Sequence, residues 1–485
     1  MSVTRRTFIG TGISAGLSCS LAAKSGGEPA ARRPNIVFIM ADDMGFADIS
    51  CNSRNGISTP NIDRIAKAGV NLREAYSNSP VCSASRLAVI TGRYQYRLPL
   101  GLEEPLVPAR RGIGLPPDHP TLPSLLKASG YRTMLVGKWH LGEYPEFGPL
   151  KSGYEHFFGF RGGAIDYFNY TQPGQGGMIE DGVPIEKNGY LTQVLGEHAV
   201  SAIDEYAAAA APFFMSVHFN APHWPWMGPD DEAEANRLGK AMREAEGYKR
   251  QAIAHHFDGG SRKVYEQMIT AMDDQVGKII DALERHDVFE NTIVIFTSDN
   301  GGERFSDVWP FSGQKSELLE GGLRVPALVS WPDVLPRGAV SHQVQMGMDW
   351  MPTLLAAAGV SSDPDYAPDG MNLLPVMVGD TRPVDRKVYF RYKANHQRAM
   401  RDGDYKYLKI AGHTYLFNVA EDPLERADLK EREPEVFARL EAGWKDWNST
   451  MLPQIDESYT DSVLAKNQAD HIGAEETLTT ADPGN

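Results

Sequence analysis

Polar side chains suited to a metal site follow two apolar runs of the sequence. Asp42 and Asp43 come just after NIVFIM, and Asp299 and Asn300 come directly after TIVIFTS. Two adjacent carboxylates repel each other when desolvated, unless a cation joins them. Four oxygen ligands without sulfur or imidazole suit a hard divalent cation, Ca²⁺ or Mg²⁺. The pattern predicts such a cation between the two segments, the alternative being that Asp42 and Asp43 cap a helix.

Four short apolar runs supply the elements that must position these residues. They are the segments 35–40, 133–136, 213–219 and 292–298. Their continuous β-branched and aromatic character is typical of buried parallel strands, and helical patterns separate them. Lys138 and His140 follow the second run, and His223 follows the third. Because ligands bind beyond the carboxyl ends of the strands in open α/β sheets, we expect all these groups to meet in one crevice.

The domain organisation follows from length and pattern. A chain of 485 residues is too long for one small core. We expect residues 31–380 to form an α/β domain, with a large mixed, mostly parallel sheet flanked by helices. From about residue 388 the pattern changes to period-two strands with turns and then a helix, so residues 381–453 are expected to form a small antiparallel sheet with one packed helix. Residues 454–485 read as a polar tail.

The first 30 residues are interpreted as a signal peptide and linker. An arginine pair, Arg5 and Arg6, precedes an apolar, glycine-rich stretch that ends in small residues, a pattern typical of twin-arginine export. A membrane anchor is the alternative, but residues 8–23 are weakly apolar and fall short of the roughly 20 that a spanning helix needs. We therefore expect a protein exported to the periplasm or the exterior, without a membrane span. Cys19 fits the pattern of a lipid-anchor site poorly.

The net charge of −15 excludes a general nucleic-acid binder, which would present a basic face. An anionic substrate must then be held by locally arranged cations.

Two cysteines, Cys51 and Cys82, remain after removal of the signal peptide. Two cysteines in a chain of this length do not form a disulfide scaffold, although a single bridge between them is an alternative. A soft thiolate is a poor ligand for Ca²⁺. Either Cys82 lies outside the metal site, or it is not a thiol in the working enzyme.

Six motifs resemble, in order, those of the type I, formylglycine-dependent sulfatases and arylsulfatases of the alkaline phosphatase superfamily. They are NIVFIMADDMG, CSASRLAVITGR, GKWHLG, APHWP, TSDNGG and GQKSELLEGGLRVP. The second is similar to the signature in which the cysteine is oxidised to formylglycine, with Ala84 where many members carry proline. The resemblance implies an alkaline-phosphatase-like fold and a maturation step catalysed by a formylglycine-generating enzyme.

The resemblance also implies a metal site and a nucleophile. Its ligands would be Asp42, Asp43, Asp299, Asn300 and the oxidised Cys82, and its ion is most often calcium, with Mg²⁺ as the other choice. One hydroxyl of the hydrated aldehyde would attack sulfur and expel the alcohol. The second hydroxyl would then lose its proton, so that the aldehyde re-forms and sulfate departs.

Five further residues receive roles from the resemblance. Arg86, one turn from Cys82, would hold the diol, and Lys138 and Lys315 would grip the sulfate oxygens. His140 would assist proton transfer at the diol, and His223 would protonate the leaving oxygen. The expected substrate is a sulfated carbohydrate, with contacts from a second group of residues in the C-terminal part: Asn395, His396 and Arg398.

Two other functions stay open at this point. Relatives with the same aldehyde and metal site hydrolyse phosphonate or phosphate esters, so a hydrolase of that kind is the first alternative. A binding protein for sulfated glycans, in which Cys82 stays a thiol, is the second.

Overall fold

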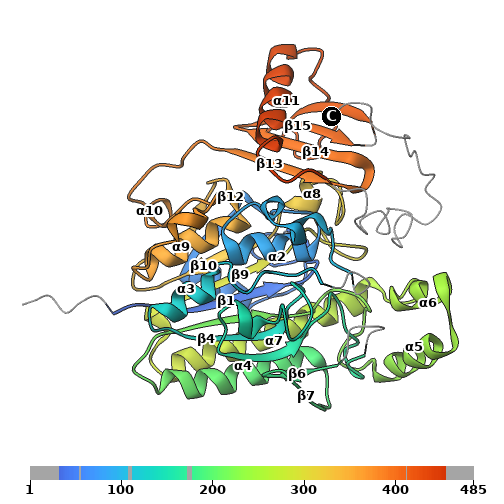
Figure 1. Ribbon diagram of the computed structural model, residues 1–485, viewed down its shortest axis with the longest axis vertical. Coiled ribbons are helices and arrows are strands. Elements are labelled where there is room, and N and C mark those ends of the chain that lie inside the picture. The colour runs from blue at the N-terminus through green and yellow to red at the C-terminus, as the bar shows by residue number, and fades with distance from the viewer. Residues whose placement is uncertain (1–31, 54–55, 108–111, 172–176, 411, 455–485) are drawn as a thin grey trace, which may run out of the picture. The chain divides into compact units, whose positions relative to one another are not determined.

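The computed structural model describes residues 32–53, 56–107, 112–171, 177–410 and 412–454 (Figure 1). The signal peptide and linker predicted for residues 1–30 and the tail from residue 455 lie outside these ranges. None of the helices in the described ranges combines the length and the apolar character needed to cross a bilayer.

A ten-stranded mixed sheet forms the centre of the described chain. Its five central strands run parallel in the order β9-β1-β8-β4-β5, and the shorter outer strands pair mainly antiparallel. The central strands are β9 (Thr292–Ser298), β1 (Asn35–Ala41), β8 (Phe213–His218), β4 (Arg132–Lys138) and β5 (His156–Phe160). The outer strands are β11 (Ala339–Ser341), β2 (Gly69–Leu72) and β10 (Ala327–Ser330) on one side, and β6 (Ile179–Glu180) and β7 (Val183–Pro184) on the other. The four predicted strands are confirmed as β1, β4, β8 and β9.

Apolar side chains on both faces of the strands require helices on both faces of the sheet. In β1, Val37 and Ile39 belong to one core, and Ile36 and Phe38 belong to the other. The first core includes α1 (Ile62–Ala68), α4 (Leu191–Ala207) and α7 (Arg262–Arg285). The second includes α2 (Cys82–Thr91), α3 (Leu122–Ala128), α9 (Trp350–Ala357) and α10 (Leu374–Met377). Figure 1 shows the two helical layers, and it shows α5 (Glu232–Glu244) and α6 (Gly247–Ala254) on the side toward which β1 points.

The C-terminal part is a separate antiparallel sheet with one helix, as predicted. Its strands lie in chain order and α11 (Pro434–Asn448) packs on the middle two. The strands are β13 (Lys387–Tyr392), β14 (Gln397–Asp402), β15 (Tyr405–Ile410) and β16 (His413–Asn418). Four further short elements matter for the site. The strands β3 (Ala75–Tyr76) and β12 (Gln345–Met346) pair with each other, α8 (Glu320–Leu323) lies between β9 and β10 in the chain, and the 3₁₀ turn η7 (Ala394–His396) joins β13 to β14.

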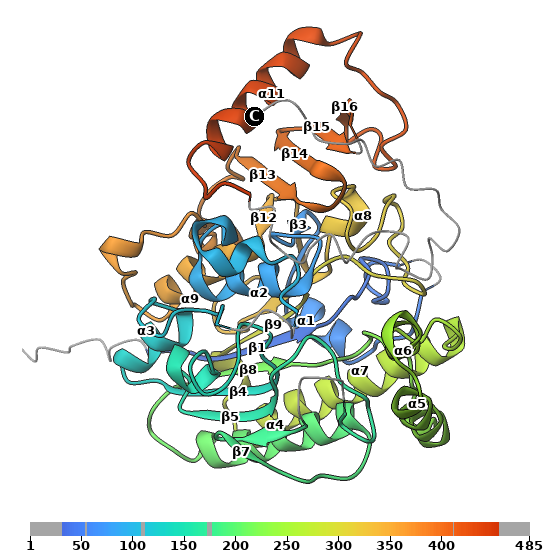
Figure 2. The same cartoon turned by 45° about the vertical axis from the view of Figure 1, so that its right-hand side comes forward.

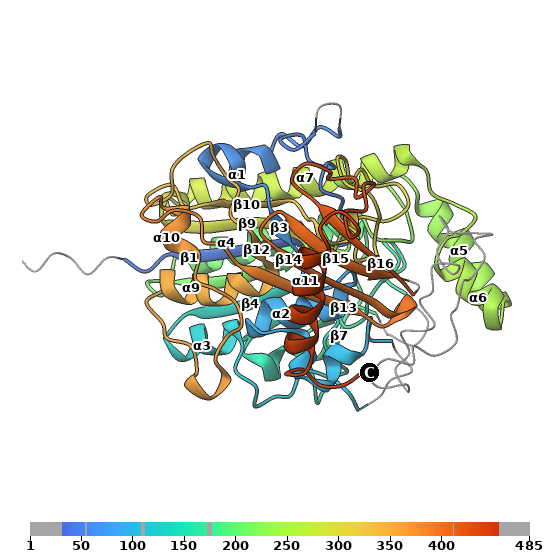
Figure 3. The ribbon, with the colours of Figure 1, turned by 90° about the horizontal axis from the view of Figure 1, so that it is seen from above.

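Helix α2 lies between the two sheets (Figure 2). Its Leu87 and Ile90 join the core of the large sheet, whereas Ala84 and Ala88 join the core that the small sheet forms with α11. Seen from above, the small sheet and α11 lie over α2 (Figure 3). The helix is therefore buried from Cys82 to Ala88, which fixes its first residue firmly against the strand ends.

Candidate active site

The carboxyl ends of β1 and β9 bring the predicted acidic residues together. Ala41 pairs with Ser298 in the parallel ladder, so the next residue of each strand, Asp42 and Asp299, leaves the sheet at the same level. The backbone N–H of Asp43 donates to Asp299 Oδ1 across 3.3 Å. Parallel register alone thus places the two acidic segments side by side.

Two residues at these strand ends have left-handed backbone conformations. Asp43 has φ 62° and His140, just after β4, has φ 58°. Such conformations cost free energy in residues other than glycine, of order 1–3 kcal/mol each, and they persist only where the surroundings enforce them. Both residues lie two positions beyond the end of a strand, where the backbone leaves the extended conformation.

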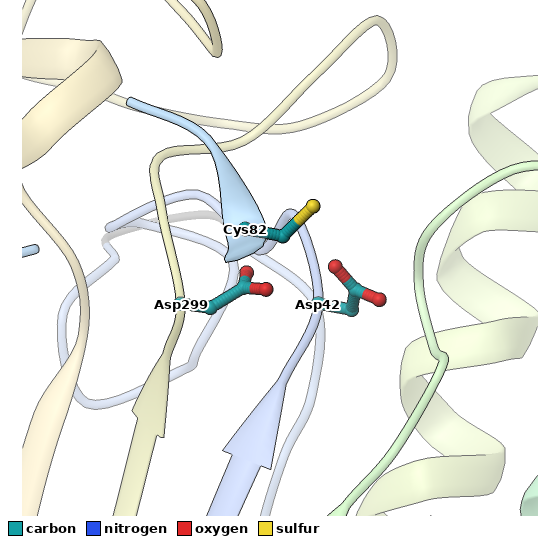
Figure 4. Close-up of side chains that lie close together, drawn as sticks. All are labelled: Asp42, Cys82 and Asp299. Atoms are coloured by element: carbon teal, nitrogen blue, oxygen red, sulfur yellow. The ribbon is translucent and has the colours of Figure 1, made fainter. Parts of the chain in front are cut away.

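Cys82 lies next to the two acidic strand ends. It is the first residue of α2, after the extended Val81, and only 2% of it is exposed. Its Sγ and one carboxylate oxygen each from Asp42 and Asp299 all lie within 4.8 Å of one another. Figure 4 shows Asp42 and Asp299 beyond the ends of two neighbouring strands, with Cys82 at the start of the helix beside them. Cys82 therefore lies inside the acidic cluster.

Each of the three buried carboxylates has a cationic partner from another part of the chain. The pairs are Lys138 Nζ to Asp42 Oδ2 at 2.5 Å, Arg86 Nε to Asp299 Oδ2 at 2.9 Å, and Lys315 Nζ to Asp43 Oδ2 at 2.6 Å. Arg86 reaches its partner because it lies one turn along α2 from Cys82. Three positive and three negative charges thus meet in a volume closed to solvent.

Burial and these charges shift the pKa values in opposite directions. Burial, and then the charge of Asp299, raise the pKa of Asp42 well above its usual range. Burial would also raise the pKa of Asp299, but Arg86 and Lys138 outweigh it and hold that pKa below its usual value. Burial opposes the charge of Lys315 too, yet Asp43 and Glu303 raise the pKa of this lysine well above its usual range.

The donor set fits a hard divalent cation. Asp42 Oδ1 and Asn300 Oδ1 are buried oxygens that have no hydrogen-bond partner among the described residues. The Asn300 amide is oriented by its Nδ2, which donates to Asp43 Oδ1 and to the Gly301 carbonyl, each across 2.8 Å, and this leaves its oxygen available. Together with Asp43 and Asp299, these groups offer oxygen ligands of the kind that Ca²⁺ and Mg²⁺ prefer. A cation here would also favour the ionised form of Asp42.

Hydrogen bonds to backbone carbonyls assign the tautomers of two histidines. His140 Nε2 is 2.8 Å from the Leu106 carbonyl, which can only accept, so Nε2 carries a proton. Its Nδ1 is buried and has no partner in the described ranges. His223 Nδ1 donates to the Trp224 carbonyl across 2.6 Å, and its Nε2 lies 3.4 Å from Asp43 Oδ2. Each ring thus keeps one nitrogen for proton transfer.

Burial lowers the pKa of both histidines well below the usual range, and nearby cations add to this effect. Lys138 is the main charge acting on His140, and Lys315 followed by Lys138 act on His223. Burial likewise raises the pKa of the Cys82 thiol, although Lys138 and Lys315 oppose it. Cys51 and Cys82 are both free thiols, so the alternative of a bridge between them is wrong.

The residues predicted to contact a carbohydrate divide into two groups. Asn395 and His396 are half-buried in η7, next to Gln397, whose amide bonds to the backbone beside Lys315. Arg398 lies over the Trp444 ring of α11, 5.0 Å from its centre. Successive residues of a strand face opposite sides, so Arg398 is on the helix-covered face of β14. The structure does not bring Arg398 to the cluster around Cys82.

One residue of the site was not predicted. Glu303 lies 3.5 Å from Lys315 Nζ and is 9% exposed, which makes it a second carboxylate partner of this lysine. Its position three residues after Asn300, in the same loop, is a signal that could have indicated it.

Comparisons with known proteins agree with this geometry. Residues 34–360 match the family model described as sulfatase, and residues 313–444 match the model described as the C-terminal part of N-sulphoglucosamine sulphohydrolase. The chain is similar to N-acetylgalactosamine-6-sulfatase of Mus musculus, with 33% identity over 77% of this chain and 71% of the relative. It is also similar to arylsulfatase A of Homo sapiens, with 31% identity over 76% of this chain and 73% of the relative.

A solved structure gives the same picture. The crystal structure of Ps i-CgsB is 29% identical and superposes with a TM-score of 0.78, over 89% of this chain and 96% of that one. A second structure of Ps i-CgsB contains k-i-k-neocarrahexaose. The predicted family and fold are therefore confirmed, because the sulfatase model alone covers well over half of the chain. The chain belongs to the sulfatase family of the alkaline phosphatase superfamily and is a sulfuric ester hydrolase.

Proposed function

We propose that this enzyme hydrolyses sulfate monoesters with residue 82, oxidised from cysteine to formylglycine, as its nucleophile, and with a divalent cation, Ca²⁺ or Mg²⁺, bound beside it. The observation that carries the proposal is the position of Cys82 within 4.8 Å of carboxylate oxygens of both Asp42 and Asp299. Sulfur is a poor neighbour for a hard cation, whereas oxygen is a good one. Hydrated formylglycine supplies an oxygen nucleophile at this position, which a thiol lacks.

The cation would be held by Asp42, Asp43, Asp299 and Asn300, and it supplies positive charge where the substrate binds. In its absence the ionised carboxylates of the site, those of Asp42, Asp43, Asp299 and Glu303, outnumber the cations Arg86, Lys138 and Lys315 by one. With a divalent cation the pocket becomes net positive, which is complementary to the anionic sulfate ester.

Two lysines of the chain act on the sulfate group in this proposal. Lys138 and Lys315 approach from different segments, one at the end of β4 and one in the loop before α8, and both are buried. Ammonium groups held in place by carboxylates need little reorganisation when negative charge develops on the sulfate oxygens. Arg86, fixed by Asp299, holds residue 82 and the start of α2 in register with the strand ends.

The two histidines divide the proton transfers. His140 donates through Nε2 to Leu106, so its buried Nδ1 is the nitrogen that can accept a proton from the nucleophile. His223 is fixed through Nδ1, so its Nε2 is the nitrogen that would take up a second proton, and the imidazolium so formed would deliver it to the leaving alcohol oxygen. The opposite tautomers thus leave Nδ1 of His140 and Nε2 of His223 for proton transfer, and the negative charge of a bound sulfate ester would favour the protonated form of His223.

A sulfated carbohydrate is the substrate class that we propose. The relatives named for N-acetylgalactosamine-6-sulfatase and the Ps i-CgsB structure with k-i-k-neocarrahexaose support this class. Asn395 and His396 are proposed to contact the sugar, because η7 adjoins the loop that carries Lys315. We do not extend this role to Arg398, which lies on the opposite face of β14.

Maturation and export remain proposals that rest on the sequence. We propose that a formylglycine-generating enzyme oxidises Cys82 and that the twin-arginine signal directs the folded protein to the periplasm or the exterior. Replacing Arg5 and Arg6 by lysine should then retain the protein in the cytoplasm, as cell fractionation would show.

Two measurements test the proposed function. Peptide mass spectrometry of the active enzyme should show the Cys82 peptide lighter by about 18 Da, the change from cysteine to formylglycine. The enzyme should hydrolyse nitrophenyl sulfate much faster than nitrophenyl phosphonate esters, and Cys82→Ala should abolish this activity. Full activity with an unmodified thiol would contradict the mechanism, and a preference for phosphonate esters would favour the alternative hydrolase.

A further inference from the structure

We propose that Gln397, on the first position of β14, is a positioning residue for Lys315 and thereby makes the C-terminal sheet part of the catalytic apparatus. The inference rests on the role proposed for Lys315 and goes beyond it, because Gln397 touches no reacting group. It acts on Lys315 through the backbone of the loop that presents the lysine.

The Gln397 side chain bridges this loop with both ends of its amide. Its Nε2 donates to the Ser316 carbonyl across 2.9 Å, and its Oε1 accepts from the Leu318 N–H across 2.7 Å. The same Nε2 also reaches the Ala394 carbonyl at 3.2 Å, at the start of η7. The side chain is only 1% exposed, so water cannot replace these bonds.

The loop needs such a clamp because its conformation is unfavourable. Ser316 has φ 71°, a left-handed conformation that is costly for a residue with a side chain. Its N–H donates to the Pro80 carbonyl across 3.0 Å, two residues before Cys82, and the N–H of Lys315 donates to the Gly302 carbonyl across 2.9 Å. Gln397 adds two bonds from the C-terminal sheet, to the Ser316 carbonyl and from the Leu318 N–H.

Without the amide, the loop loses its bonds to β14 on either side of Glu317, and with them part of the support of the strained Ser316. Lys315 Nζ lies 2.6 Å from Asp43 Oδ2 and is the group that would move. A shift of about 1 Å in a catalytic group can reduce the rate about a hundredfold. Gln397→Met keeps the volume of the side chain but removes the two hydrogen bonds to the loop and the one to the Ala394 carbonyl.

The chain offers a matched control in Gln343. This glutamine is 2% exposed and also bridges backbone with both ends of its amide: Nε2 donates to the Val384 carbonyl at 3.1 Å, and Oε1 accepts from the Val384 N–H at 2.6 Å. In the described chain its hydrogen bonds go to Ser341, Val344 and Val384, and none of these residues belongs to the Lys315 loop or to the active site. Its Nε2 also donates to the Val344 carbonyl at 2.9 Å, so Gln343→Met removes an equivalent set of three buried bonds elsewhere.

The test is a double-mutant cycle with Lys315→Ala, on enzyme whose conversion at residue 82 has been quantified by mass spectrometry. We expect kcat/KM for nitrophenyl sulfate to fall about 100- to 1,000-fold in Lys315→Ala and about 10- to 100-fold in Gln397→Met. The double variant should be no slower than Lys315→Ala alone, because the lysine that Gln397 positions is already absent. Gln343→Met should lower the melting temperature by a similar amount as Gln397→Met and leave kcat/KM within twofold.

The outcomes separate this inference from the proposed function. If Lys315→Ala retains full activity, the proposed role of the lysine fails, and the positioning role fails with it. If Lys315→Ala is impaired but Gln397→Met is not, or if the two losses multiply in the double variant, only the positioning role is overturned. A loss of activity in Gln343→Met as large as that in Gln397→Met would also overturn it, since general destabilisation would then explain both.

Discussion

Lys315 Nζ donates to Asp43 Oδ2 across 2.6 Å, although 272 positions separate the two residues in the sequence. Both are buried, so the charge of the lysine is fixed at the strand end and not shared with solvent. This ion pair holds a lysine from a loop next to the acidic residues at the strand ends.

Lys315→Ala should therefore lower kcat/KM for nitrophenyl sulfate about 100-fold or more, since a preorganised cation is lost from the sulfate position. Lys445→Ala is the control, because Lys445 is 60% exposed and pairs with Glu441 on the same helix face. A loss below threefold in Lys315→Ala would count against the role proposed for this lysine.

Calcium should stabilise the folded protein through the buried oxygens. At a concentration 100 times the dissociation constant, binding to the folded state adds about 2.7 kcal/mol to the free energy of unfolding. Thermal unfolding with EDTA and with added calcium would measure the shift. Asp42→Asn should abolish most of the shift, and Asp281→Asn, at a 59% exposed position, should keep it. An equal shift in both variants would place the ion elsewhere.

Gly163→Ala should impair catalysis by displacing His140. A Cβ at position 163 would lie 2.6 Å from Cε1 of the His140 ring, closer than real contacts allow. We expect kcat for nitrophenyl sulfate to fall about 10- to 100-fold. Gly239→Ala is the control, because a Cβ there meets nothing closer than 3.6 Å. Unchanged kcat in Gly163→Ala would mean that the exact position of the His140 ring is not needed.

The role proposed for η7 predicts a difference between substrates. The double variant Asn395→Ala/His396→Ala should lose activity on sulfated oligosaccharides and retain it on nitrophenyl sulfate, because only the larger substrate would reach η7. Arg398→Ala should affect neither, since Arg398 lies against Trp444 on the other face. Equal losses of the double variant on both substrates would contradict a sugar contact.

A buried ion cluster between the sheets makes stability depend on pH. Lys406 Nζ lies 2.9 Å from both Glu320 Oε1 and Glu425 Oε1. Burial opposes ionisation of Glu320, but Lys406, Arg324 and others hold its pKa far below the usual value. The stabilisation from Glu320 is thus complete above the ordinary pKa of a glutamate and is lost as the pH falls through its lower folded value.

Lys406→Met should lower the free energy of unfolding by about 3–5 kcal/mol at pH 8, since it leaves buried carboxylates with fewer partners. Burial already raises the pKa of Glu425 to about 7, so protonation at pH 5 relieves part of the penalty. Urea unfolding should therefore show a smaller loss at pH 5 than at pH 8. Lys387→Met, at a 53% exposed position, should cost less than about 1 kcal/mol at both values. A penalty for Lys406→Met that is independent of pH would contradict this account.

The strands and their catalytic ends could be predicted because both signals are local. β1 and β9 are uninterrupted apolar runs, and Asp42 and Asp299 stand directly after them. Parallel pairing then brings such residues together without further information. The role of residue 82 could not be settled locally, because a thiol is a poor ligand for the hard cation that the neighbouring oxygen ligands suit.

Contacts that depend on side-chain direction or distant pairing were not predictable in the same way. The alternation in β14 was visible, but nothing in the sequence tells which face turns to the active site, so Arg398 was grouped with Asn395 and His396. The short strand β2, GVNL, follows α1 without a turn and carries no distinctive pattern. The clamp from Gln397 joins residues about 80 positions apart and has no sequence signature at all.

Helix α2 contributes side chains to the core of the large sheet and to the core of the small sheet. Removal of the small sheet would therefore expose one side of α2. Ending the chain at residue 380 would expose Ala84, Ala88 and Tyr76 to solvent, because these residues pack in the core that β13–β16 and α11 complete. Loss of that cover would loosen the very helix that begins at Cys82. The catalytic centre and the C-terminal sheet are therefore expected to unfold together, as one cooperative unit.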